Sequence, residues 1–308
     1  MRRDVIFAVL AGCLSGVLHI AVTGGGLGSV ILGFLAMVPL FAAGLGLGLV
    51  PALVAGGTGI AIVLATAGML SGLFFALAYL APVAVLTRQA LLHRPDAAGN
   101  QEWYPPGLLL AWLTGLGGLV ALFVILQPLD LERDALIRED LARAFSKFAS
   151  IDPAAATRTA DLMLSILPGQ FAVSWMLMVI VNSALAQGLL ARFQRNLRPS
   201  PAMADIRLPM AIPAAFALAL AVGLIGGNLS RYGFIAVMIL AVPLCMQGLA
   251  VVHAFAARLA APGLLLFVFY FMLLFGWLLP LVLLLGVIEQ WAGLCRRFKR
   301  GPPDQEDE

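Results

Sequence analysis

This 308-residue chain has few charged residues. Asp, Glu, Lys and Arg make up 11% of it, whereas 62% of its residues are hydrophobic and the mean hydropathy is +1.00. Because soluble domains carry roughly 25% charged residues, this composition excludes an ordinary water-soluble protein. The net charge of +3 is small, so we also expect no nucleic-acid partner.

Cysteine and histidine are scarcer still. The three cysteines, Cys13, Cys245 and Cys295, form no CxxC motif, and the three histidines are isolated in the sequence. These spacings argue against a disulfide framework and against a zinc site. The chain also lacks HExxH, GxSxG and Walker motifs. We therefore expect no metal, no cofactor and no enzymatic activity, with an intramembrane enzyme of unfamiliar site as a remaining alternative.

Long uncharged apolar runs are what the sequence has in abundance. About 20 helical residues cross a hydrocarbon layer of about 30 Å, and these runs lack the alternation of barrel strands. The sequence predicts an all-α polytopic transmembrane helical bundle, a single membrane domain over 1–295, and a basic-then-acidic disordered tail over 296–308. The apparent spans lie at roughly 5–22, 29–48, 50–67, 69–91, 107–126, 170–192, 208–226, 233–257 and 263–290.

The distribution of Lys and Arg favours an even number of spans. Nine spans would divide these residues almost equally between the two sides, whereas eight would place most of them with a cytoplasmic N-terminus. We therefore predict eight spans, with nine as the alternative, and a cytoplasmic C-terminus. The run at 263–290 is the one that we expect not to cross the membrane completely, because Gly276 and Pro280 would break it into a re-entrant pair. A misjudged pair within 29–67 is the other possibility.

One segment, LERDALIREDLARAFSKFAS at 131–150, is rich in charge. Ile137, Leu141, Phe145 and Phe148 form an apolar stripe at helical spacing. The spacing predicts an amphipathic helix within an extramembrane insertion, 127–168, that caps the outer face of the bundle. A passive interfacial helix and a lid or docking element are both compatible with this pattern.

Details of the same insertion can be predicted from local rules. Pairs of opposite charge four residues apart, Asp134 with Arg138 and Glu139 with Arg143, support the amphipathic helix. A second short helix begins near Thr157, and Pro168 is expected to end it.

Polar side chains within the spans are few, and the span centres contain no Asp, Glu, Lys or Arg. This absence argues against a proton relay, an ion-coupled carrier or a voltage sensor. Trp175, Asn182, Gln247 and His253 are the candidate pocket residues for a neutral, partly aromatic solute. The alternative at each position is structural: an inter-helix hydrogen bond for the amides, and an interfacial anchor for Trp175 and His253.

Glycine pairs four residues apart predict close helix packing. These pairs are Gly12 with Gly16, Gly44 with Gly48, Gly68 with Gly72, and Gly223 with Gly227.

Six stretches, taken in order along nearly the whole chain, carry a resemblance to a known family. They are LGFLAMVPLFAAGLGLG, SGLFFALAYLAPVAVL, EWYPPGLLL, RLPMAIPAAFALAL, QGLAVVHAF and LGVIEQWAGLCRRFKR. With them the chain resembles the YybS-like family of predicted bacterial membrane proteins of unknown function, in its alphaproteobacterial form. That family is remotely similar to the substrate-binding membrane components of energy-coupling-factor transporters.

The resemblance implies a multi-pass protein of the bacterial inner membrane that captures a solute without ion coupling. Since the chain has no Walker motif, such a component would need an energising ATPase as partner. The alternative is a non-catalytic scaffold or assembly factor that docks another membrane protein through 127–168. In either case the lipid bilayer is a partner.

Overall fold

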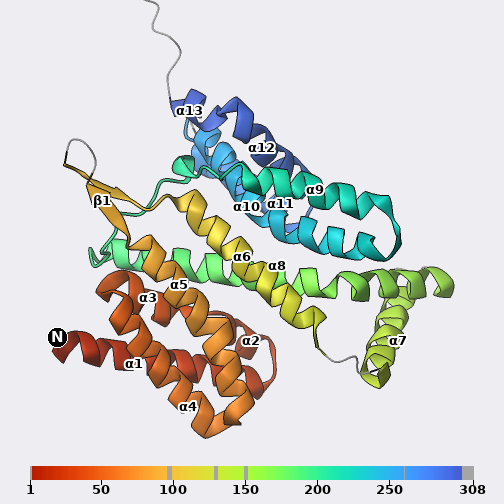
Figure 1. Ribbon diagram of the computed structural model, residues 1–308, viewed down its shortest axis with the longest axis horizontal. Helices are drawn as coiled ribbons and strands as arrows, with labels where there is room; N and C mark the ends of the chain where they lie inside the picture. The colour runs from red at the N-terminus through yellow and green to blue at the C-terminus, as the bar shows by residue number, and fades with distance from the viewer. Residues whose placement is uncertain (1, 96–98, 128–130, 149–151, 260, 300–308) are drawn as a thin grey trace, which may run out of the picture. The chain divides into compact units, whose positions relative to one another are not determined.

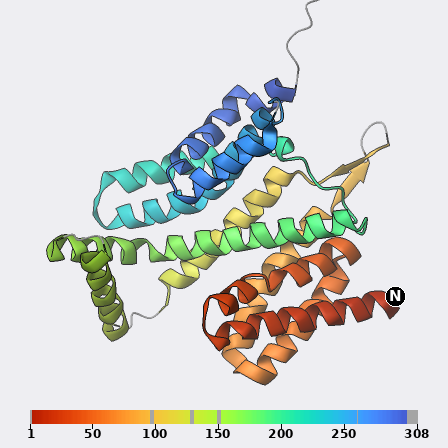
Figure 2. The same ribbon diagram turned by 180° about the vertical axis from the view of Figure 1, so that it is seen from behind.

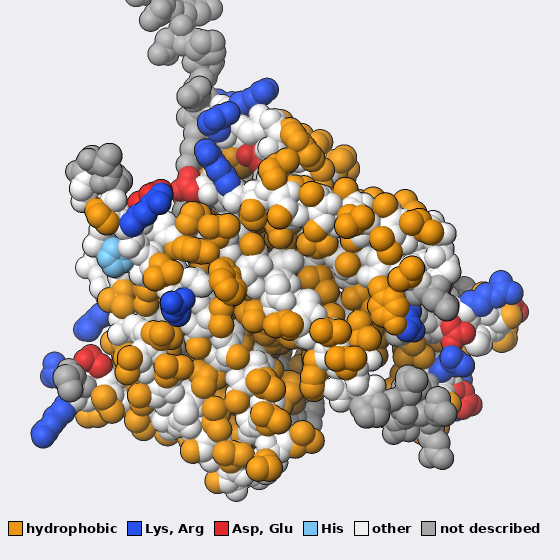
Figure 3. All heavy atoms as spheres, viewed as in Figure 1, with side chains coloured by type: hydrophobic (Ala, Val, Ile, Leu, Met, Phe, Trp, Pro, Cys, Tyr) orange, Lys and Arg blue, Asp and Glu red, His pale blue; other side chains and the backbone are white. Residues whose placement is uncertain are grey.

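The structure is a computed structural model that describes residues 2–95, 99–127, 131–148, 152–259 and 261–299. Within these residues the regular secondary structure is helical apart from one short antiparallel hairpin of two strands, β1 (His93–Pro95) and β2 (Gln101–Trp103). The predicted all-α class is therefore confirmed. Hydrophobic side chains dominate the face drawn in Figure 3, as expected for helices whose outer surfaces meet lipid rather than water.

Two compact units make up the chain. The first unit comprises Met1–Leu113, Met176–Pro209 and Cys245–Glu308, and the second comprises Thr114–Trp175 and Met210–Leu244. Three helices contribute residues to both units: α6 (Pro106–Ile125), α8 (Pro153–Arg192) and α10 (Ser230–Ala256).

The N-terminal helices of the first unit pack through glycine. They are α1 (Arg2–Ala21), the 3₁₀ turn η1 (Val22–Gly24), α2 (Leu27–Phe34), α3 (Met37–Leu47), α4 (Leu49–Phe75), the π-helix η2 (Ala76–Leu80) and α5 (Ala81–Ala90). In Figures 1 and 2 these helices lie side by side. A Cβ atom on Gly12 would lie 2.2 Å from the carbonyl oxygen of Ala55, and Gly16 faces Gly59 in the same way. The predicted packing role of these two glycines is confirmed.

Gly68 interrupts a helix instead of packing two helices together. It lies inside α4 with φ 83° and ψ 178°, a backbone conformation that interrupts the helix and that side chains with a Cβ rarely adopt. The boundary that the sequence predicts between 50–67 and 69–91 coincides with this residue. Gly68 therefore divides the 42 residues from Leu49 to Ala90 into two apolar segments.

Helix α8 differs from the prediction at Pro168. The expected short helix does not end there, because one helix of 40 residues runs from Pro153 to Arg192 with Pro168 inside it. Figure 2 shows this helix without interruption. Its N-terminus is capped by Asp152, whose Oδ2 accepts hydrogen bonds from the backbone N–H groups of Ala154 and Ala155. At 1.5 Å per residue α8 is about 60 Å long, roughly twice a hydrocarbon layer.

The second unit contains the predicted amphipathic helix, α7 (Leu131–Phe148). Ile137, Leu141 and Phe145 are partly buried, whereas Leu136, on the face of α7 opposite Phe145, is 61% exposed. The side chain of Phe148 lies outside the described residues, so its place in the stripe stays a prediction.

The ion pairs of α7 agree in part with those predicted from the sequence. Arg143 lies 3.8 Å from Glu139, as predicted, and 2.9 Å from Asp140. Arg138 pairs at 2.7 Å with Asp161 of α8; the side chain of Asp134, its predicted partner, lies outside the described residues. The contact with Asp161 joins α7 to the first turns of α8.

Two further helices of the second unit meet through small residues. The short helix α9 (Ala211–Ile225) is followed by the turn η4 (Gly227–Leu229) and by α10. A Cβ atom on Gly233 would lie 2.3 Å from the backbone nitrogen of Gly223, and the Ser230 hydroxyl donates to the Gly223 carbonyl oxygen at 2.5 Å. Both contacts bring the backbones of α9 and α10 together.

The C-terminal part of the first unit is bent where the sequence suggests. Helices α11 (Pro262–Leu274) and α12 (Leu279–Ala292) change direction by 116° at a short break that contains Gly276. Gly276 has φ 76°, and Pro280 lies in the first turn of α12. A short helix, α13 (Leu294–Lys299), follows. The rest of the predicted tail, 300–308, lies outside the described residues.

Length and composition support fewer spans than predicted. Within the described residues, six helices are long and apolar enough to cross a membrane, or seven if α11 and α12 together form one span. The difference from eight or nine has two sources. Residues 49–90 count as one helix across Gly68, and α9 has 15 residues. The number of spans therefore stays a prediction.

Candidate functional site

Asn182 is fully buried and connects α8 to the break between α2 and α3. Its Nδ2 donates to the carbonyl oxygens of Phe34 and Met178, both at 2.8 Å. On the other side of the break, the Ser15 hydroxyl donates to the Ala36 carbonyl oxygen at 2.5 Å. These carbonyl groups need side-chain donors because the ladder of regular helix bonds is interrupted there. The arrangement matches the structural alternative for Asn182.

The other predicted pocket residues are not gathered around Asn182. Trp175 is buried in the second unit, so a pocket shared with Asn182 is not shown. His253 is half-buried in the first unit: its Nδ1 lies 2.9 Å from the Leu249 carbonyl oxygen and its Nε2 lies 3.3 Å from the Tyr270 hydroxyl. With both ring nitrogens engaged by α10 and α11, His253 has the surroundings of a packed side chain.

Gln247 has a different environment. It is 2% exposed, and its Nε2 donates to Oε1 of Gln290 on α12 at 3.2 Å. Gln290 in turn donates to the Leu208 carbonyl oxygen at 2.9 Å. The carbonyl oxygen of Gln247, Oε1, is buried and has no hydrogen-bond partner among the described residues.

Close backbone contact between α10 and α12 fixes the position of Gln247. A Cβ atom on Gly248 would lie 2.0 Å from the carbonyl oxygen of Val282 and 3.1 Å from the nitrogen of Gly286. Only glycine permits such an approach. It places Gln247, the preceding residue, beside Gln290.

A cavity of about 300 Å³ opens at Gln247, and we call it the Gln247 cavity. All of its lining belongs to the first unit and comes from residues 204–208, α10, the end of α12 and the start of α13. Its polar lining consists of Asp205, Arg207, Gln247, Glu289, Gln290 and Arg296.

The charges of this lining are incompletely paired. Both carboxylate oxygens of Glu289 accept from the backbone N–H of Cys295, at 3.3 and 3.2 Å. Within the described part of the chain Glu289 forms no ion pair, and neither do Arg207 and Arg296, which are exposed. The cavity thus combines a buried acceptor, the half-buried carboxylate of Glu289, the exposed carboxylate of Asp205 and two guanidinium groups.

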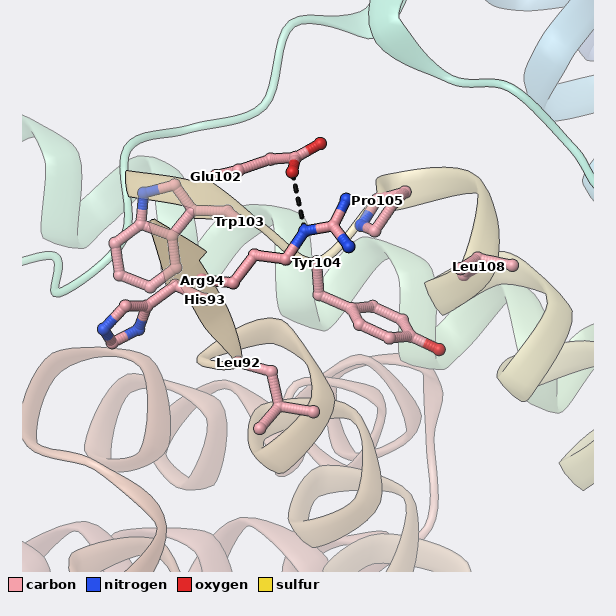
Figure 4. A pocket seen from close by; sticks show the side chains of 8 residues that line it. All are labelled: Leu92, His93, Arg94, Glu102, Trp103, Tyr104, Pro105 and Leu108. Carbon is pink, nitrogen blue, oxygen red and sulfur yellow. Dashed lines mark hydrogen bonds and ion pairs between the residues drawn. The ribbon is translucent and has the colours of Figure 1, made fainter. Parts of the chain in front are cut away.

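A second cavity, of about 350 Å³, lies between the β-hairpin and α6 (Figure 4). There Arg94 and Glu102 pair across the strands at 2.7 Å, and the hydrogen bond to Glu102 raises the pKa of Arg94. The rings of His93 and Trp103 lie 5.0 Å apart. These polar groups are exposed and satisfy one another, so this cavity offers a ligand less than the Gln247 cavity does.

Arg198 is a buried residue that the sequence does not single out. Its Nη1 donates to the Ala90 carbonyl oxygen at 3.0 Å and its Nη2 to the Tyr104 carbonyl oxygen at 2.8 Å, while its guanidinium lies 6.0 Å from the Trp103 ring centre. Burial lowers the pKa of this guanidinium. Arg198 lies in the basic loop that follows α8, residues 193–207, and holds this loop against the end of α5 and the hairpin. In the sequence it looks like its exposed neighbour Arg195.

Metal binding finds no support in the described geometry. No three His, Cys, Asp or Glu side chains of the described residues come together in a group able to hold a metal ion.

The fold defines an integral, multi-pass α-helical membrane protein. Residues 143–289 match a family model described as "Predicted membrane protein (DUF2232)". The matched segment, less than half of the chain, includes Asn182, Gln247 and most of α12. No curated protein and no solved structure matches the chain. The chain is thus similar to a family of predicted membrane proteins, which agrees with the coarser part of the resemblance noted in the sequence.

Proposed function

We propose that this protein binds a small polar solute in the Gln247 cavity, as the membrane component of a transport system without ion coupling. The observation that carries the proposal is Gln247, which lines a cavity of about 300 Å³ and whose buried Oε1 has no hydrogen-bond partner among the described residues. A buried acceptor without a donor costs about 1–3 kcal/mol. An N–H or O–H group of a solute would remove that cost. The volume suits a molecule at the small end of the usual range of ligand sites.

Two aspects of the sequence bear on how such transport would be energised. The span centres lack Asp, Glu, Lys and Arg, so the protein has no charged relay for coupling to protons or ions. The chain also lacks a Walker motif, so energy would come from a partner ATPase.

The test uses the full-length protein in lipid nanodiscs. A panel of vitamins, amino acids and small metabolites is screened by thermal shift, and each hit is titrated by calorimetry. We expect saturable binding of one solute class and its loss in Gln247→Leu. Gln187→Leu is the matched control, because the Gln187 amide already donates to the Arg198 carbonyl oxygen and lies outside the cavity. Equal binding by both variants, or no saturable solute, would reject the proposal.

We also propose that the protein lies in the bacterial inner membrane with both termini cytoplasmic. Within the first unit, Leu197 of the basic loop donates to the Leu45 carbonyl oxygen, which puts the end of α3 beside that loop. Helix α4 begins there, and the contacts of Gly12 with Ala55 and of Gly16 with Gly59 make α1 parallel to it. The N-terminus therefore starts on the side of the basic loop.

Helix α13 lies on the same side. Cys295 of α13 packs in a cluster with Ala250 and Val251 of α10 and with Ala204 and Ile206 after the basic loop. Helix α11 starts just beyond α10, so α11 leaves this side and α12 comes back to it. This supports a re-entrant pair rather than a complete ninth span.

A scaffold role for 127–168 is the second candidate. Leu162, on the part of α8 joined to α7 by the pair between Arg138 and Asp161, is 67% exposed, and Leu136 of α7 is 61% exposed. A photo-crosslinking residue at position 162, in cells, distinguishes the outcomes. A single crosslinked protein supports docking, whereas crosslinks to lipid alone argue against it.

A further inference from the structure

We infer that the solute of the Gln247 cavity is a small zwitterion, with a primary ammonium group a few bonds from an anionic oxygen group. This inference rests on the proposed function, because it assigns the chemical class of the ligand to the same site. It is carried by the order in which acceptors and cations line the cavity from its floor to its mouth.

The floor and wall of the cavity offer acceptors. Gln247 is nearly fully buried with a free Oε1, and half-buried Glu289 receives hydrogen bonds from the backbone of Cys295 without an ion pair among the described residues. A primary ammonium has three N–H donors and a positive charge. It can bond the amide oxygen and neutralise the carboxylate at once, whereas a hydroxyl group would leave the carboxylate without a counter-charge.

The mouth of the cavity offers two cations, beside the exposed carboxylate of Asp205. Arg207 and Arg296 are exposed and have no ion-pair partner in the described part of the chain. Guanidinium groups bind carboxylate and phosphate oxygens in a bidentate way. The left-handed backbone of Gly293 (φ 58°) turns the chain between α12 and α13, and the Arg296 guanidinium lies 3.6 Å from the position of a Cβ on Gly293. The turn thus folds Arg296 back over the cavity.

These positions give the solute an orientation. The ammonium lies inward against Gln247 and Glu289, and the anionic group lies outward between Arg207 and Arg296. A cavity of about 300 Å³ limits the buried part to the size of an amino acid or of an ethanolamine phosphate group. The same chemistry is found in free amino acids and in the headgroup of an aminophospholipid, and Trp291, at the rim, is exposed as interfacial tryptophans are.

The experiment uses full-length protein in nanodiscs of phosphatidylcholine and phosphatidylglycerol, which lack ethanolamine headgroups. Glycine, L-alanine, β-alanine and O-phosphoethanolamine are titrated by calorimetry, beside propionate and alaninamide, which each lack one of the two charges. We expect binding of a zwitterion at least about tenfold tighter than that of either single-charge analogue. We expect a loss of about tenfold or more in Glu289→Gln and in the double variant Arg207→Gln/Arg296→Gln. Arg195→Gln, an exposed arginine of the same basic loop outside the cavity, is the matched control.

A second arm of the experiment tests whether the ligand is the headgroup of an aminophospholipid. If the headgroup is the ligand, free zwitterions do not bind, and adding phosphatidylethanolamine to the nanodiscs raises the melting temperature of the wild type but not of Glu289→Gln. Binding that depends on Gln247 but is unchanged in Glu289→Gln overturns the zwitterion and leaves the proposed function standing. Absence of saturable binding in both arms, and across the wider solute panel, overturns both.

Discussion

Asn182 and Gln247 show how two similar residues can have different roles. Each is an amide in an apolar helix, and each is buried with an unpartnered carbonyl oxygen. The Nδ2 of Asn182 bonds two carbonyl groups at a helix break, and neither described cavity includes this residue. Gln247 lines a cavity. The sequence identifies both as costly polar groups in lipid, but their partners come from helices distant in the chain and are not predictable from local pattern.

Replacing Asn182 with Leu should destabilise the protein. The substitution keeps the number of side-chain heavy atoms and their branching but removes the donor to the Phe34 carbonyl oxygen, which has no regular helix bond at the break. We expect a loss of about 1–2 kcal/mol in the free energy of unfolding, measured by denaturant unfolding in mixed micelles.

The control for this prediction is Ser183→Ala. The Ser183 hydroxyl bonds the Ile180 carbonyl oxygen of its own helix, so its loss should change stability by less than about 0.5 kcal/mol. Equal losses in the two variants would contradict a special role for Asn182.

At the scale of elements, the amphipathic stripe of α7 can be tested by a matched pair of substitutions. Phe145 is partly buried and Leu136 is largely exposed. Phe145→Ser should lower the melting temperature, because partial burial of an aromatic side chain contributes on the order of 1 kcal/mol. Leu136→Ser should leave the melting temperature nearly unchanged. Melting curves of both variants in nanodiscs decide the matter, and a larger effect of Leu136→Ser would mean that the opposite face of α7 is the buried one.

The continuity of α8 through Pro168 is a second prediction at this scale. Spin labels at Arg158 and Ser174 are separated by 16 helical residues, and pulsed electron paramagnetic resonance should give a distance near 24 Å between the backbones. Labels at Val5 and Ala21 of the proline-free helix α1 provide the control at equal spacing. The native cysteines are first replaced. A distance clearly shorter at α8 than at α1 would show that Pro168 folds the chain back.

Proline and glycine show where sequence rules succeed and fail for helix ends. The boundary expected near Gly68 and the break expected at Gly276 are found, since both residues have positive φ. Pro168 does not end its helix. A proline removes one backbone donor but fixes a φ that a helix accepts, and apolar helices tolerate it when neighbouring groups satisfy the freed carbonyl. Pro243, inside α10, is tolerated in the same way.

For the whole molecule, the side of each loop can be measured directly. Single cysteines at Arg94, Ser200 and Arg297 should react with a membrane-impermeant maleimide in inverted vesicles and not in spheroplasts, because the proposed topology has these three positions on the cytoplasmic side. A cysteine at Glu139 of α7 should react in spheroplasts. Labelling of Arg297 from the outside would show that α11 and α12 cross the membrane completely.

The class of the molecule is predictable because composition decides it. With so little charge, the chain can bury its helices in lipid but cannot form a water-soluble fold. The number of spans is not predictable in this way. It depends on whether two segments separated by Gly68 each cross the membrane, and on whether α11 and α12 turn back at Gly276. Both are matters of packing rather than of hydropathy.

The short arms of the bend at Gly276 have a consequence for biosynthesis. With 13 and 14 residues, neither α11 nor α12 has the length at which a helix is inserted into the bilayer by itself. Helix α12 needs the backbone surface at Gly248 of α10 to lie against. Because α10 leaves the ribosome before α11 and α12, the surface at Gly248 is already present when the two short helices are made.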